Sequence, residues 1–153
     1  MSFDPSSFLH ATTTESNDTQ LVPVPEGEYI AIAEKVDMRQ WKKKDDPSAT
    51  GLALDITWNI DDAGVKAALG REKVTVRQGI MLDVTDDGTG LDMGKGKNVG
   101  LGKLREALDL NQPGRPFAPS MIEGRMCKVQ VKHRLDPQDA EKIYSEVKAN
   151  ARV

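Results

Sequence analysis

The sequence has little of what disulfide, metal and nucleophile sites need. It contains one cysteine and two histidines in 153 residues. A single cysteine, Cys127, excludes an internal disulfide, and it falls on the apolar side of a period-two segment, which predicts a core residue. Neither a CxxC nor an HxxxH pattern occurs. Because structural zinc sites need such clusters, we expect no metal, and no motif indicates a cofactor.

Nothing in the chain resembles a nucleophile paired with a base. Cys127 and His133 fall on the same side of one segment but are six residues apart. At about 3.3 Å per residue they are separated by roughly 20 Å in an extended strand. A catalytic triad needs its members within hydrogen-bond reach, so we expect a protein that is not an enzyme.

Long apolar runs are also missing, and charge of either sign is not in large excess. No stretch approaches the roughly 18 apolar residues of a membrane span, and residues 1–10 lack the basic and apolar regions of a signal peptide. We therefore expect a cytoplasmic protein with no membrane partner. Residues 1–20 hold three acidic groups and no Lys or Arg, so the remaining 133 residues balance 21 acidic (24 − 3) against 21 basic groups. A neutral body neither indicates nor excludes nucleic-acid binding, because the sorting of charge between faces decides it.

What is present is alternation of apolar and polar residues. The clearest case is Gly51–Ile60, where five apolar residues including Trp58 share one side, so Trp58 is predicted to be core. This period of two is typical of half-buried β-strands. Five such segments are predicted as strands: Glu28–Met38, Leu52–Ile60, Lys73–Val84, Arg125–Leu135 and Lys142–Ala151. Alternation places some residues inward, among them Ile30, Ile32, Val84, Leu135, Ala149 and Ala151, and others outward, among them Tyr29 and Asn150.

Between the third and fourth strands, helical spacing predicts one helix over Val99–Leu110, with Asn98 as its N-cap. Val65–Leu69 has the length of a single helical turn, and Gly79 indicates a β-bulge. Gln40–Thr50 and Asp86–Asn98 are expected to be loops.

The predicted fold is mainly β: a five-stranded antiparallel barrel like the OB-fold, with one helix between strands three and four. A β-sandwich with a peripheral helix is the alternative. Residues 1–22 are expected to form a flexible arm and 23–153 a single domain.

Cations and aromatic residues gather at the end of the first strand and on the outward sides of the others. Cations can follow a phosphate backbone while flat side chains stack on bases, at about 1–3 kcal/mol per base. The predicted single-stranded-nucleic-acid site comprises Tyr29, Arg39, Trp41, Lys42, Lys43, Lys44, Lys73, Arg77, Lys128, Lys132, Arg134, Tyr144 and Lys148.

Five short segments carry a resemblance to a known group of proteins. They are PEGEY (25–29), GLAL (51–54), LREALDL (104–110), VQVKH (129–133) and IYSEVK (143–148). Together they resemble small bacteriophage proteins of the replication module, which are thought to bind single-stranded DNA through an OB-like fold. The resemblance covers about residues 23–151 and implies DNA binding, but it carries no catalytic or binding signature to transfer. The acidic C-terminal tail of cellular single-stranded DNA-binding proteins is not present at 148–153.

The favoured hypothesis is a non-catalytic protein that binds single-stranded DNA without sequence preference, acting in phage DNA replication or recombination. The protein would then act in the host cytoplasm. Its expected protein partners are replication or recombination proteins, and it could also form a homo-oligomer. The alternative is a structural or adaptor protein of a phage particle or replication complex. The near-neutral body and the apolar residues of the N-terminal arm favour that alternative.

Overall fold

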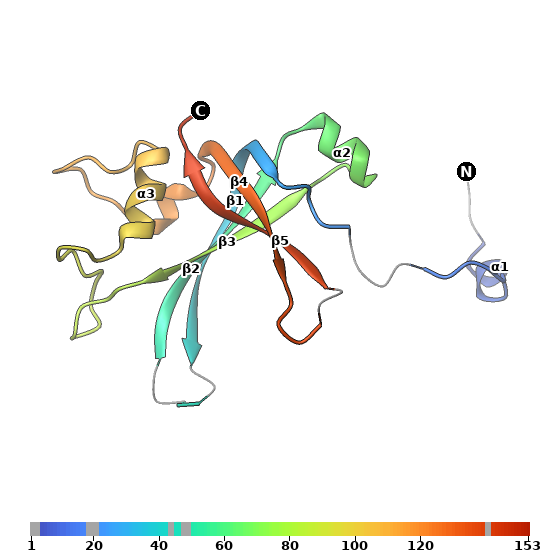
Figure 1. The fold of residues 1–153 in the computed structure, drawn as a ribbon, viewed down its shortest axis with the longest axis horizontal. Helices are drawn as coiled ribbons and strands as arrows, with labels where there is room; N and C mark the ends of the chain where they lie inside the picture. Colours follow the sequence, from blue (N-terminus) through green and yellow to red (C-terminus); the bar gives the residue numbers. More distant parts are fainter. Residues whose placement is uncertain (1–3, 18–21, 43–44, 47–49, 140–141) are drawn as a thin grey trace.

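Five strands form the framework of the fold. The computed structural model describes residues 4–17, 22–42, 45–46, 50–139 and 142–153. The strands are β1 (Gly27–Lys42), β2 (Thr50–Ile60), β3 (Thr75–Leu82), β4 (Met126–Leu135) and β5 (Ile143–Ala151). They pair in the order β1-β2-β3-β5-β4, and β4 pairs in turn with β1, so the sheet closes into a ring (Figure 1). A mainly β fold with five strands was predicted correctly.

The expectation of a purely antiparallel sheet is wrong. β3 and β5 run parallel and meet at one residue pair, Arg77 with Glu146, while the other neighbours are antiparallel. A closed ring with an odd number of strands cannot alternate direction at every step, so at least one pair must be parallel. The sheet is therefore mixed.

Helical elements stand in two of the connections between strands. α3 (Val99–Ala107) lies between β3 and β4, where a helix was predicted. The helical turn predicted at Val65–Leu69 is present as α2 (Ala63–Leu69), between β2 and β3, so the predicted barrel with a single helix is wrong in its helix number. A 3-10 turn, η1 (Pro119–Ile122), precedes β4. Asp62 begins α2 by accepting a hydrogen bond from the Val65 amide, a standard N-cap. The short helix α1 (Pro5–Leu9) lies apart from the sheet in Figure 1, and residues 4–17 are exposed throughout.

Asn98 occupies the N-cap position of α3 but does not cap the helix with its side chain. It has a positive φ of 52°. Its side-chain oxygen accepts from the Asp83 amide at 2.8 Å, and its Nδ2 donates to the Asp83 and Asp92 carbonyls. These bonds hold the two ends of the segment between β3 and α3 together. Asn98 therefore closes a loop, and its predicted capping role is wrong.

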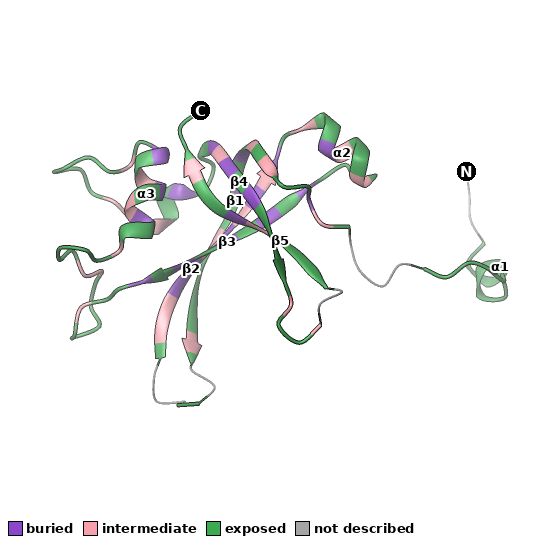
Figure 2. Ribbon diagram, in the orientation of Figure 1, coloured by how far each residue is buried: buried purple, intermediate pink, exposed green. Residues whose placement is uncertain are grey.

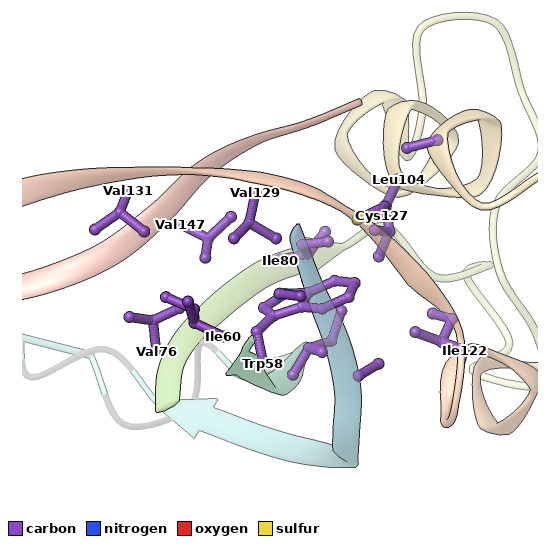
Figure 3. Packing of buried hydrophobic residues seen from close by; sticks show 14 of the residues in the cluster. Trp58, Ile60, Val76, Ile80, Leu104, Ile122, Cys127, Val129, Val131 and Val147 are labelled. Carbon is purple, nitrogen blue, oxygen red and sulfur yellow. The ribbon is translucent and has the colours of Figure 1, made fainter. Parts of the chain in front are cut away.

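The core fills the inside of the ring. Trp58 is fully buried, as predicted, and Leu54, Ile56 and Ile60 on its side are buried with it, whereas Leu52 is partly buried. Figure 3 shows Trp58 among side chains from β3, β4 and β5, with Leu104 of α3 and Ile122 of η1 packed over the ring. Cys127 is buried as predicted, and burial raises the pKa of its thiol to about 11. Figure 2 shows buried positions along the strands, and exposed positions at the end of β4 that leads into the connection to β5.

The inward face of β1 is opposite to the predicted one over its first half. Ala31 and Ala33 are buried, whereas Ile30 and Ile32 are 41% and 36% exposed. Ala33 lies opposite Trp58 in the β1–β2 register. The small side chain of Ala33 leaves room for the Trp58 indole inside the closed sheet. A register shift between Ala33 and Lys35 then reverses the alternation.

The predicted bulge at Gly79 does not occur, because Gly79 stays in register with Asp55. The shift on the C-terminal side of the sheet lies instead between β4 and β5, next to Val131. It reverses the faces of β5 after Val147. Asn150, predicted to point outward, consequently bonds to the buried Gln78, and Ala149 and Ala151 are exposed rather than inward. Leu135 and Val84, both predicted to be inward, are 58% and 37% exposed, because they lie beyond the closed part of the ring.

Candidate nucleic-acid interface

Two arginines of the predicted site share one carboxylate on the outer face of the sheet. Arg39 of β1 donates from Nε to Asp55 Oδ2 at 2.7 Å, and from a terminal nitrogen to Oδ1 at 3.4 Å. Arg77 of β3 approaches Asp55 from the other side at 3.9 Å. The Asp55 carboxylate raises the pKa of the Arg39 guanidinium through this hydrogen bond and its charge. Asp55 side-chain exposure is only 14%, so both arginines are held across β2 while staying exposed themselves.

A second shared carboxylate lies on β5. Glu146 pairs with Lys148 at 2.7 Å and with Arg134 of β4 at 3.4 Å. Hydrogen bonding to Lys148, followed by the charges of Lys148 and Arg134, lowers the pKa of Glu146. The Arg134 guanidinium also lies 5.0 Å from the centre of the Tyr144 ring, close enough for a cation–π contact.

These two clusters form one continuous row, which we call the charge ladder. The Asp55 cluster and the Glu146 cluster are joined because Arg77 and Glu146 are partners in the β3–β5 register. The ladder consists of Arg39, Asp55, Arg77, Glu146, Arg134 and Lys148. It crosses all five strands and contains four cations and two carboxylates, a surplus of two positive charges.

Trp41 was predicted to lie in a loop, but it lies at the C-terminal end of β1. It pairs in register with Gly51 of β2, and β1 continues through Lys42. The indole lies against the Gly51 backbone: an added Cβ on Gly51 would be 2.4 Å from the Trp41 ring. The Trp41 Nε1 is enclosed and has no hydrogen-bond partner among the described residues. The ring is therefore half-buried and held close to the ladder's β1 end. Lys43 and Lys44 lie outside the described residues, as do residues 47–49 of the predicted Gln40–Thr50 loop.

Replacing Gly51 with alanine is expected to displace the Trp41 ring, because no real Cβ tolerates a 2.4 Å contact. Acrylamide quenching of tryptophan fluorescence should then increase, since Trp58 remains fully buried. Gly102→Ala is the matched control, because a Cβ there meets nothing within 4 Å. Equal quenching in both variants would contradict this placement of Trp41.

The two tyrosines of the predicted site do not behave alike. Tyr144 is 41% exposed, and its hydroxyl donates to Asp136 at 3.1 Å, which raises the pKa of the phenol. Tyr29 was predicted to face outward, but it packs against the core and donates to the Pro25 carbonyl at 2.8 Å. Burial raises the pKa of the Tyr29 phenol. Tyr144 remains available for stacking, whereas Tyr29 acts as a structural residue.

Several predicted cations lie away from the ladder or are held by other carboxylates. Lys73 forms an ion pair with Glu34, and Lys128 is 3.9 Å from Glu28. Lys132 is exposed on β4 and in register with Glu146, so it extends the ladder, while Lys42 is exposed beside Trp41. The structure thus unites Arg39, Arg77, Arg134 and Lys148, with Lys132 beside them, and separates Lys73 and Lys128.

Metal-ligating side chains and His133 are the other candidates for a chemical site. Among the described residues, no three His, Cys, Asp or Glu side chains come together in a way that could hold a metal ion. His133 Nε2 is 2.7 Å from the Val24 carbonyl, and its amide donates to Glu26. His133 therefore holds the segment that precedes β1 against β4.

Comparison with known proteins adds no identification. No protein-family model matches the chain, and no curated protein has a similar sequence. Within the part of the chain that the structure describes, no helix has both the length and the apolar character to cross a membrane.

Proposed function

We propose that this protein binds single-stranded DNA without sequence preference and without catalysis. The observation that carries the proposal is the charge ladder, in which four cations share two carboxylates across the outer face of all five strands. Guanidinium groups bind phosphate in a fork geometry, and a carboxylate that holds one in place reduces the rotamer entropy lost on binding. Because each carboxylate serves two cations, a phosphate can bind without separating a complete ion pair.

The strand order supports an OB-like fold for this function. A closed sheet in which β5 lies between β3 and β4 is a Greek-key arrangement of five strands, as in the OB-fold. OB-folds bind oligonucleotides on strands two and three and on the loop between strands one and two. Asp55 and Arg77 lie on those two strands. Trp41 and Lys42 stand at the β1 end that leads into that connection.

Trp41 and Tyr144 mark the two aromatic ends of the ladder. Trp41 lies near Arg39 on β1, and Tyr144 lies under Arg134 on the β4–β5 side. Bases stacked on these rings, with phosphates along the ladder, give binding that tolerates any sequence. By resemblance to phage replication proteins, the DNA would be an intermediate of phage replication or recombination in the host cytoplasm, and replication or recombination proteins would be partners.

The direct test is the affinity for a fluorescent oligo-dT measured by anisotropy over a range of salt concentrations. With about four phosphate contacts, the logarithm of the binding constant should fall with the logarithm of salt concentration at a slope of about −3. Absence of binding at low salt would contradict the proposal.

The rival function, a structural or adaptor protein, is favoured by one specific observation. Ile30, Ile32 and Met126 are exposed together where β1 pairs with β4, and Ile32 lies opposite Met126. An exposed apolar patch of this kind is typical of protein contacts. If oligo-dT does not bind in the anisotropy titration and light scattering shows that the protein forms a closed oligomer, the rival function is favoured.

A further inference from the structure

β3 and β5 enclose a groove that the charge ladder does not fill. The two strands are joined by the single pair Arg77–Glu146 and diverge beyond it, toward α3. The groove has a volume of about 450 Å³, within the range of small-molecule pockets. Its walls come from β3, β5 and the start of α3 and include Gln78, Met81, Lys103, Lys148, Ala149 and Asn150.

Two side-chain amides at the groove are fixed in orientation by the core. The Trp58 indole N–H can only donate, and it donates to Gln78 Oε1 at 2.9 Å. Asn150 Nδ2 donates to the same oxygen at 3.0 Å, and Gln78 Nε2 donates to Asn150 Oδ1 at 2.6 Å. This leaves one N–H of Gln78 and one acceptor position of Asn150 without a bond to any other described residue. The pair can therefore offer a donor and an acceptor side by side.

The rest of the groove combines an apolar rim with positive charge. Met81 is 59% exposed, and its polarisable thioether suits contact with an aromatic ring. Lys148 and Lys103 bring two cations, of which Lys148 is paired with Glu146, and Lys103 has no carboxylate within 4.0 Å among the described residues. A flat ligand with a polar edge and negative charge beside it fits these walls.

We propose that the groove between β3 and β5 takes one unstacked base of the bound single strand, with the flanking phosphates at Lys103 and Lys148. The inference rests on the proposed function, because the strand must already lie along the charge ladder. Glu146 and Lys148 belong to the ladder and also line the groove, and Arg77 is the register partner of Glu146 on the neighbouring strand. A strand bound at Arg77 therefore passes its opening, and the base there can turn in without leaving the phosphate row.

The test fills the groove and compares DNA with and without bases. Ala149 is exposed and lines the groove, so Ala149→Trp places a large ring in it. Ala151→Trp is the matched control, since Ala151 is exposed on the same strand but lies outside this groove. Binding is measured with oligo-dT and with an abasic deoxyribose-phosphate oligomer of the same length. Ala149→Trp is expected to weaken oligo-dT binding about tenfold, the size of one base contact, and to leave abasic binding unchanged.

Each other outcome overturns the inference in a recognisable way. Equal loss for both oligomers would mean that the new ring disturbs the phosphate row, and unchanged affinity for both would place every base elsewhere. The same loss in Ala151→Trp would remove the groove's special role. If the unmodified protein binds neither oligomer, the proposed function itself fails, and the groove has no DNA to receive. A folded control spectrum by circular dichroism excludes unfolding as the cause of any loss.

Discussion

Replacing Trp58 with alanine is expected to lower the free energy of unfolding by about 3–5 kcal/mol, as for other large core aromatic residues. Trp58 is fully buried at the centre of the ring, where Ala33 and Val76 are its register partners. The substitution leaves a cavity and also removes the indole donor from Gln78, a residue only 8% exposed. Urea denaturation followed by circular dichroism measures the loss.

Two comparison variants make this result specific. Trp58→Phe keeps most of the ring volume but loses the N–H, so we expect a smaller loss of about 0.5–1.5 kcal/mol, because Gln78 Oε1 still accepts a hydrogen bond from Asn150 Nδ2. Trp41→Ala removes a half-buried ring at the open end of β1, and it should cost less stability than Trp58→Ala. If Trp41→Ala were the more destabilising of the two, the assignment of Trp58 as the central core residue would be wrong.

Reversing both arginines that share Asp55 is expected to weaken oligo-dT binding by at least about 100-fold at low salt, about 2.7 kcal/mol. The Arg39→Glu/Arg77→Glu variant removes two phosphate contacts and adds two repulsive charges beside Asp55. The dependence of affinity on salt should become shallower by about 1.4 in slope, since each contact to a single strand contributes about 0.7. Anisotropy titrations at three or more salt concentrations measure both quantities.

The matched control separates the position of the charges from their number. Lys66→Glu/Arg115→Glu changes the net charge by the same amount, but Lys66 lies on α2 and Arg115 in the segment after α3, away from the ladder. Its affinity should fall much less, and its salt slope should stay near that of the unmodified protein. Equal losses in the two double variants would mean that net charge rather than the ladder controls binding.

The candidate site was only partly predictable from the sequence. Period two on β3 and β4, and on β1 beyond its register shift, correctly assigned Arg77, Arg134 and Arg39 to outward positions, because alternation alone decides the face of a regular stretch of strand. It failed for Tyr29 and Asn150. Both lie on strands with register shifts, and a shift puts the side chains before it and after it on opposite faces relative to a single alternation. One signal for the groove was present: Gln78 is a polar residue at an inward position of β3, where its neighbours Val76 and Ile80 are apolar.

The sequence by itself determined the strands, the helix before β4, and the burial of Trp58 and Cys127. These follow from local periodicity and composition, which need no knowledge of neighbouring strands. Only the tertiary structure decided which charges meet. Asp55 and Arg77 are 22 positions apart, and Arg77 and Glu146 are 69 apart, so their contact depends on strand order and register. The parallel β3–β5 pair comes from closing an odd ring, a property of the whole sheet. The charge ladder and the groove beside it both exist because of that closure.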